Sequence, residues 1–240
     1  MAKEKRQDMV AAPKEAALAV PTTYDQRGKE EVLDAKDRMY PMLTLVQKMS
    51  PSEHLAVAKE GEMINNLTLE NYGKSITIVP ILYRKQRIMW IPRKQGGGIE
   101  CRSFDGKQGT KWGECAVCEH QKWHQDAKDE QDKKPKCTEY FSIPVLIMKE
   151  EPELIIASFG MTRYAVGKKL VNLIFGKPSI PSFGGKYQLS SFIEHGELGD
   201  YANYEVKGAG LLSKDDPIYQ LAEGWYTTLS KDQLHTDQPA

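Results

Sequence analysis

Residues 101–137 have the sequence CRSFDGKQGTKWGECAVCEHQKWHQDAKDEQDKKPKC and contain all four cysteines of the 240-residue chain. Cys115 and Cys118 form a Cys-x-x-Cys knuckle, a spacing that lets both thiolates face one tetrahedral ion. Cys101 and Cys137 lie on either side of the knuckle and do not form a second one. We predict that the four cysteines bind one zinc ion, and that the ion is structural because four protein ligands leave no open position.

The composition of this segment supports the metal prediction. Residues 126–136 are almost all charged, so they cannot build a hydrophobic core of their own. A closed thiolate site would supply folding energy of about 10 kcal/mol or more. Two alternatives remain open. His120 or His124 replaces one of the distant cysteines, or the knuckle is a redox site, although redox sites of this type need no further cysteines.

The overall composition indicates an ordinary globular domain. Apolar residues make up 40% and charged residues 28% of the chain. No apolar run approaches the roughly 20 residues that a membrane-spanning helix needs, so we expect no membrane association. Lys14 and Glu15 interrupt the only apolar stretch near the amino terminus, which argues against a secretory signal. We therefore expect a cytoplasmic, reducing setting, in which clustered cysteines more often bind metal than form disulfides.

The pattern of apolar and turn residues predicts a series of strands interrupted by helices. Residues 75–83 and 87–91 are expected to form a hairpin across the polar RKQ, and residues 138–148 and 154–159 another pair. A helix over 163–175 should end at Gly176, followed by a hairpin of 187–193 and 201–206. A final helix over 217–229 should be capped by Asp215 or Asp216. Residues 40–73 are interpreted as a docking segment.

The order of strands, helix and two further strands predicts a mainly β fold with helices (α+β), specifically an OB-fold-like five-stranded barrel with an inserted zinc-binding loop. The alternative is an unrelated α+β sheet with the same order of elements. We predict a flexible amino-terminal arm over 1–38 and an OB-fold-like domain over 39–212 with the zinc insertion at 99–138. A helix and short tail over 213–240 complete the chain.

The chain is neutral overall but its charges are segregated. Residues 84–94 and 161–187 each contain five basic and no acidic residues, whereas residues 189–240 have nine acidic and three basic ones. Cations that follow phosphates and aromatic faces that stack on bases hold single-stranded nucleic acid. The candidate residues are Tyr83, Arg84, Lys85, Arg87, Trp90, Arg93, Lys94 and Tyr140. The alternative is a solvated strand edge in which Trp90 belongs to the core.

Catalytic motifs are missing from the sequence. There is no Walker A loop, no G-x-S-x-G and no H-E-x-x-H, and the zinc deaminase signature is also absent. The acidic residues form no recognisable metal-binding constellation. We therefore expect a protein that is not an enzyme.

The chain resembles a group of tailed-phage proteins related to zinc-containing single-stranded DNA-binding proteins. The resemblance covers about residues 40–210 and is carried by three motifs: PMLTLVQKMSPSE (41–53), GGGIECRSFDGKQGTKWGECAVCEHQKW (96–123) and KPKC (134–137). It implies an OB-fold with an inserted zinc element and an acidic tail that recruits replication partners. The sequence departs from this pattern in having four cysteines where the best-known members have three and one histidine, and in its barely acidic tail, SKDQLHTDQPA.

The residues predict a sequence-tolerant single-stranded DNA-binding protein, and the resemblance implies that it acts in phage DNA replication or recombination, in the host cell cytoplasm. Replication or recombination proteins are the expected protein partners, and the oligomeric state is left open. The main alternative is a zinc-stabilised structural or assembly protein that binds proteins rather than DNA. A second alternative is a zinc-dependent nuclease or transcription factor, and the missing carboxylate cluster counts against the nuclease.

Overall fold

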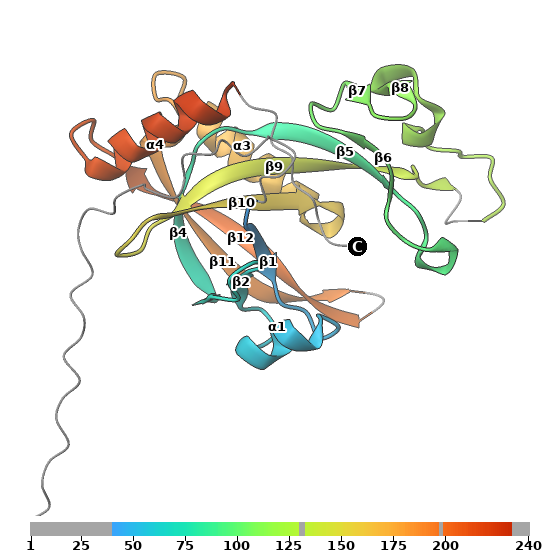
Figure 1. Ribbon diagram of the computed structural model, residues 1–240, viewed down its shortest axis with the longest axis horizontal. Coiled ribbons are helices and arrows are strands. Elements are labelled where there is room, and N and C mark those ends of the chain that lie inside the picture. Colours follow the sequence, from blue (N-terminus) through green and yellow to red (C-terminus); the bar gives the residue numbers. More distant parts are fainter. Residues whose placement is uncertain (1–39, 130–132, 197–198, 232–240) are drawn as a thin grey trace, which may run out of the picture. The chain divides into compact units, whose positions relative to one another are not determined.

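One large β-sheet organises the part of the chain that the computed structural model describes, residues 40–129, 133–196 and 199–231 (Figure 1). The strand order is β12-β11-β4-β9-β10-β1-β2-β3, and β5 and β6 extend the sheet beside β9 to a total of ten strands. The fold is mainly β with a few helices, an α+β architecture. The predicted amino-terminal arm (1–38) and the carboxyl-terminal residues 232–240 lie outside the described residues.

The strands of the large sheet are β1 (Met42–Leu45), β2 (Met63–Asn65), β3 (Asn71–Gly73), β4 (Ser75–Pro80), β5 (Arg84–Trp90), β6 (Ile99–Ser103), β9 (Cys137–Ile147), β10 (Glu153–Gly160), β11 (Gly185–Gly196) and β12 (Gly199–Leu211). Two short strands, β7 (Gln108–Gly109) and β8 (Gly113–Glu114), form a separate pair. The helices are α1 (Ser52–Val57), α3 (Tyr164–Phe175) and α4 (Pro217–Leu229).

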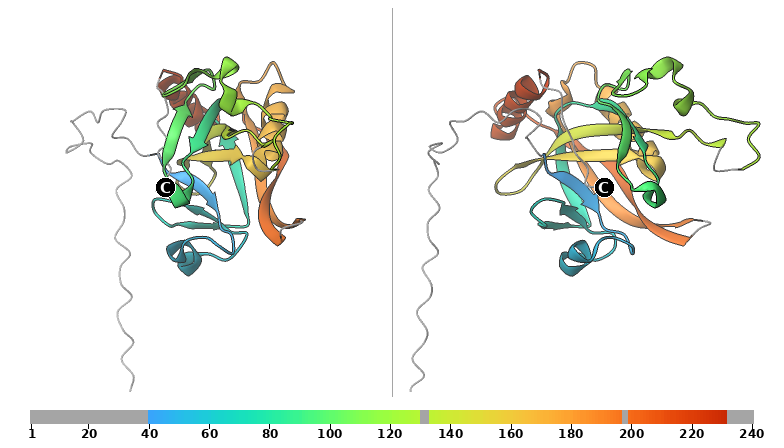
Figure 2. Two further views of the ribbon diagram at one scale, coloured as in Figure 1. Left: turned by 90° about the vertical axis from the view of Figure 1, so that its right-hand side faces the viewer. Right: turned by 45° about the vertical axis from the view of Figure 1, so that its right-hand side comes forward.

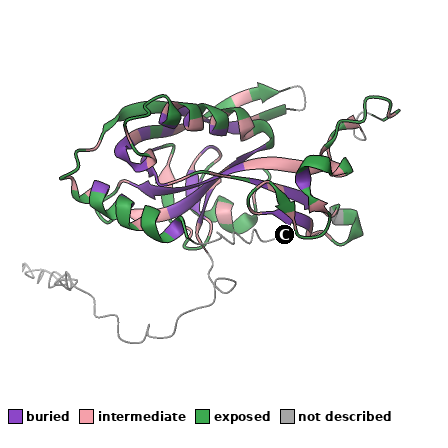
Figure 3. Ribbon diagram, turned by 90° about the horizontal axis from the view of Figure 1, so that it is seen from above, coloured by how far each residue is buried: buried purple, intermediate pink, exposed green. Residues whose placement is uncertain are grey.

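Strand β9 is buried continuously from Phe141 to Ile147 because it lies between two cores. Phe141, Ile143 and Val145 belong to the main core, which α3 covers with Leu170 and Ile174. Leu146 belongs to a second core beneath α4. Figure 3 shows the buried residues concentrated in the sheet, and α3 and α4 each contribute a few of their own. Alternate side chains of β9 therefore pack into the cores on opposite faces of the sheet.

The predicted elements from residue 138 onward are confirmed. Strands β9 and β10 form an antiparallel pair, as do β11 and β12. Helix α3 ends at Gly176, as the sequence predicts. The side chain of Asp216 caps α4 by accepting the N–H of Ile218 at 2.9 Å, and Pro217 occupies the first turn, where its missing N–H costs nothing.

The predicted hairpin of residues 75–83 and 87–91 is wrong. Both β4 and β5 run antiparallel to β9, β4 along Val145–Ile147 and β5 along Cys137–Ser142, so β4 and β5 follow one direction. The polar residues at 84–86 lie inside β5 instead of in a turn. Strand β9 is long enough to offer one edge to both segments, and side chains across the pair compensate the charges of β5.

The expectation of a five-stranded barrel also needs correction. The segment 40–73, interpreted as a docking segment, supplies β1, β2 and β3, and β1 pairs in parallel with β10. Within the described ranges, no backbone ladder closes the sheet into a barrel. A side chain connects the two sides instead: the Gln47 amide donates to the Ala202 carbonyl of β12 and accepts its N–H, each at 2.9 Å.

No helix among the described residues is long and apolar enough to span a bilayer.

Candidate metal centre and nucleic-acid interface

All four cysteine side chains line one small cavity, about 20 Å³ in volume, where β5, β6 and β9 meet residues 104–129, here named the cysteine segment. Cys101 of β6 and Cys137 of β9 are both paired with Met89, on the strand between them. Cys115 lies in a short 3-10 turn, and the N–H of Cys118 donates to the Cys115 carbonyl at 3.2 Å. The fold therefore brings the four predicted ligands to one place. Their segment projects beyond one end of β5 and β9 (Figure 2).

The chemical state of the thiols bears on metal binding. All four cysteines are free, and Cys101 and Cys115 are buried. Burial raises the pKa of Cys137 to about 11, an effect that Arg87 opposes and the other three cysteines reinforce. A thiol with this pKa stays protonated at neutral pH unless a cation stabilises its thiolate.

The cysteines do not form a closed metal site as they stand. In the described part of the chain, no group of three or more His, Cys, Asp or Glu side chains has the arrangement that would hold a metal ion. The sulfur atoms would have to move closer together around an ion. Four cysteine side chains are nevertheless the donor set of one class of structural zinc site.

The two histidines that follow the knuckle are separated by the fold. His120 lines the same cavity as the cysteines and packs edge-on against Trp112, with ring centroids 4.9 Å apart. His124 lies instead with Trp123 and Lys136 beside a separate surface depression. Of the two histidine alternatives, only His120 is placed where it could contribute to the cysteine site.

The predicted nucleic-acid-binding residues divide between the two faces of β5. Lys85 and Arg87 both donate to the Glu139 carboxylate, at 3.0 and 2.7 Å, on the face that α3 covers. Trp90 lies on the other face, where its indole N–H donates to the Tyr140 hydroxyl at 3.3 Å. Because successive side chains of a strand point in opposite directions, the candidates do not form one continuous surface.

Three of the candidates line a groove beside the cysteine segment. Tyr83, Arg84 and Lys85 contribute to its lining, and the Arg84 guanidinium donates to the Leu229 carbonyl at the end of α4 at 2.5 Å. Trp90 and Tyr140 lie elsewhere, Lys94 is exposed, and the Arg93 side chain lies outside the described residues. Of the predicted nucleic-acid-binding residues, the groove therefore contains only those at the start of the series.

The rest of the groove lining includes residues that sequence reasoning missed. Phe104 and Lys107 belong to the cysteine segment, and Lys231 follows α4. Asp105 also lines the groove, but the N–H groups of Lys107 and Gln108 and the Ser103 hydroxyl donate to its carboxylate. The isolated positions of Lys107 and Lys231 in the sequence carry no signal of a shared surface. Only the approach of α4 to the cysteine segment brings them together.

These features define an α+β protein in which a four-cysteine cavity adjoins a groove lined by basic and aromatic residues, and Gly109 contributes to both. Over residues 7–235 the chain matches the model of the Pam3 phage gp34-like protein family, and it belongs to that family. It is therefore identified as a phage protein. No curated protein and no solved structure matches the chain.

Proposed function

We propose that this phage protein binds single-stranded DNA without strong sequence preference and acts in DNA replication or recombination. The observation that carries the proposal is the groove, in which Tyr83 and Phe104 accompany Arg84, Lys107 and Lys231. Cations attract the phosphates and aromatic rings stack on bases of any sequence, a combination that gives affinity without base readout.

The charge balance of the groove supports this proposal. Among the residues that the structure describes, Lys107 and Lys231 have no carboxylate partner and remain available for phosphate. Lys85 is partly neutralised by Glu139, and Arg84 is held by the end of α4, which fixes its guanidinium at the wall of the groove. Asp105 is the acidic residue of the lining, and its carboxylate is occupied by backbone N–H groups. The lining is therefore positively charged on balance.

We further propose that β4–β5, β9, β10, β11 and β12 form an open variant of the OB-fold. The bent first strand β4–β5 pairs with both β9 and β11, and α3 follows β10, an order that agrees with a partly open Greek-key barrel. Strand β1 and the Gln47 side chain would take the place of the usual closing pair. The cysteine segment would then occupy the loop between the first two strands, a loop that contacts oligonucleotides in this fold.

The zinc ion belongs to the same proposal. Cys101, Cys115, Cys118 and Cys137 would hold it, and its role would be to fix the segment that forms one wall of the groove. A structural zinc supplies folding energy where a polar segment lacks a core. This role involves no chemical step.

The test is a fluorescence anisotropy titration of labelled oligo-dT at two or more salt concentrations. The unmodified protein should bind, and its affinity should fall steeply with salt. The double variant Lys107→Gln/Lys231→Gln should bind more weakly, and its salt slope should be smaller by about 1.4, which is about 0.7 for each lost phosphate contact.

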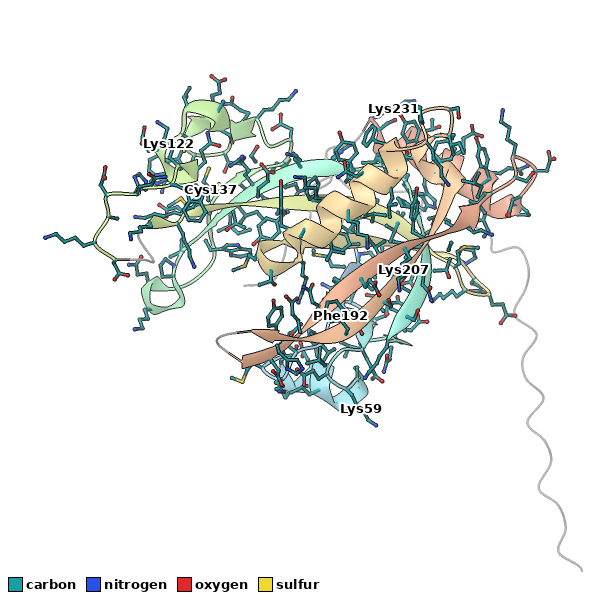
Figure 4. All side chains as sticks on the ribbon, turned by 180° about the vertical axis from the view of Figure 1, so that it is seen from behind. Lys59, Lys122, Cys137, Phe192, Lys207 and Lys231 are labelled. Carbon is teal, nitrogen blue, oxygen red and sulfur yellow. The ribbon has the colours of Figure 1, made fainter. Side chains whose placement is uncertain are left out.

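Lys59→Gln/Lys207→Gln is the control, because these lysines are exposed and lie away from Lys231 (Figure 4), although Lys207 is also paired with Glu205 at 3.1 Å. The control should retain both the affinity and the salt slope. Equal losses in the two double variants would exclude the groove as the binding surface. No binding by the unmodified protein, together with recovery of a stable protein complex, would support the structural or assembly alternative.

A further inference from the structure

An exposed aromatic pair lies at the edge of the groove. Tyr83, which precedes β5, and Phe175, the last residue of α3, meet edge to face, with ring centroids 5.2 Å apart and an interplanar angle of 89°. The two residues are 92 positions apart in the sequence, and only the packing of α3 against the sheet brings them together. Sequence reasoning singled out Tyr83 but not Phe175.

Both rings remain exposed to solvent although they contact each other. Phe175 is 57% exposed and Tyr83 is 39% exposed. An edge-to-face contact occupies the edge of one ring and one face of the other, so ring faces outside the contact can receive a further ring. The last residue of a helix need not be apolar for the helix to pack, since Leu170 and Ile174 already cover the core. The contact of α3 with the sheet therefore does not explain why residue 175 is a phenylalanine.

The surroundings of the pair indicate what would bind there. Tyr83 also lines the groove, together with the cationic residues Arg84, Lys85, Lys107 and Lys231. A ligand that reaches the pair along the groove must therefore combine a planar apolar group with negative charge. A single-stranded nucleic acid has this combination, because each unpaired base is linked to a phosphate. An apolar peptide segment carries no negative charge that could pair with the cations.

We propose that Phe175 and Tyr83 form a stacking platform for one unpaired nucleobase, and that the adjacent cations hold the phosphates of the same strand. This inference rests on the proposed function and extends it by assigning Phe175, a residue outside the cation groove, as a binding residue. The contact is to the π-face of the base, so the platform accepts any base.

The experiment replaces the aromatic ring while keeping the apolar character. Phe175→Leu should weaken binding of a short oligo-dT by about 5- to 150-fold, the range expected for the loss of one base stack. The salt slope should stay unchanged because no phosphate contact is lost. Tyr83→Leu, on the other side of the pair, is the second variant and should behave in the same way. Thermal unfolding of each variant confirms that it is folded.

Phe192→Leu is the matched control, because Phe192 is 46% exposed but lies beside a different groove, with Ala165 and Lys169 (Figure 4). It should bind like the unmodified protein. Oligonucleotides with one abasic position, moved stepwise along the strand, give an independent readout. One position should weaken binding to the unmodified protein, and Phe175→Leu should abolish that sensitivity.

Salt-dependent binding by the unmodified protein together with unchanged affinity of Phe175→Leu would overturn the platform alone and leave the proposed function standing. A parallel loss in Phe192→Leu, or a changed salt slope in Phe175→Leu, would also overturn it. Absence of any oligonucleotide binding by the unmodified protein would overturn both proposals.

Discussion

Gly109 illustrates how closely the backbone of the cysteine segment approaches the sulfur atoms. A Cβ atom at this position would lie 3.0 Å from the Cys101 sulfur, 3.3 Å from the Gly113 carbonyl oxygen and 3.9 Å from the Cys115 sulfur. A methyl group at this position would leave no room for the sulfur atoms to move closer together around an ion. Glycine at this position is therefore explained by the cavity itself.

Gly109→Ala should weaken zinc binding by about 10- to 100-fold, as substitutions that disturb the surroundings of metal ligands do. The unmodified protein should contain one zinc ion per chain by elemental analysis, and competition with a chromophoric chelator measures the affinity. Gly208→Ala is the control, because its Cβ would meet nothing within 4 Å. Equal affinities in the two variants, or an unmodified protein without zinc, would contradict the proposed centre.

Helix α3 packs on the sheet through a glycine in its middle. A Cβ atom on Gly167 would lie 2.6 Å from Cβ of Phe159 and 2.9 Å from the Phe141 ring. The helix is therefore seated closer to the sheet than any side chain at this position would allow. Glycine lowers helix propensity by about 1 kcal/mol relative to alanine, a cost that the closer packing offsets.

Replacing a glycine by alanine should therefore change the free energy of unfolding in opposite directions in α3 and in α4. Gly167→Ala should lower the free energy of unfolding by about 1–3 kcal/mol through overpacking, despite its better helix propensity. Gly224→Ala, in α4, meets nothing within 4 Å and should raise the free energy of unfolding by about 0.5–1 kcal/mol. Urea denaturation measures both. Stabilisation by both substitutions would show that α3 can move away from the sheet without cost.

Distant segments of the chain are joined by a polar network around Glu153. Its carboxylate accepts hydrogen bonds from the Asn65 amide at 2.7 Å, the Tyr72 hydroxyl at 2.8 Å and the Lys149 ammonium at 2.8 Å. Burial alone would raise the pKa of Glu153, but the hydrogen bonds from Lys149 and Tyr72 outweigh it, and the pKa is lowered. This network connects β2 and β3 to the turn between β9 and β10.

The lowered pKa sets the direction of a pH effect. In the unfolded chain a glutamate has a pKa of about 4.3, so the network stabilises the fold fully above that pH. The stabilisation is lost as the pH falls through the lower folded pKa. The free energy of unfolding, measured in urea from about pH 6 to pH 3, should therefore decrease less steeply in Glu153→Gln than in the unmodified protein. Glu150→Gln, exposed in the same turn, should keep the original slope; parallel curves for all three proteins would refute the linkage.

The sequence alone predicted those features that depend on neighbouring residues. The apolar run of β9, the helix that ends at Gly176 and the cap at Asp216 all follow from local periodicity and local hydrogen bonding. The grouping of the four cysteines was also predicted from the sequence, because the Cys-x-x-Cys knuckle at Cys115 and Cys118 is a local spacing. Even the α+β class followed from the order of such elements.

The tertiary structure decided how these elements pair and which surfaces result. Residues 84–86 lie inside a strand because Glu139, more than fifty positions away, compensates two of the neighbouring charges. The Gln47–Ala202 contact and the Tyr83–Phe175 pair likewise join distant segments. A strand's partner and the neighbours of an exposed ring depend on which other segments reach them in space. Local patterns do not contain that information, because the free energy of such contacts is gained only when the whole sheet assembles.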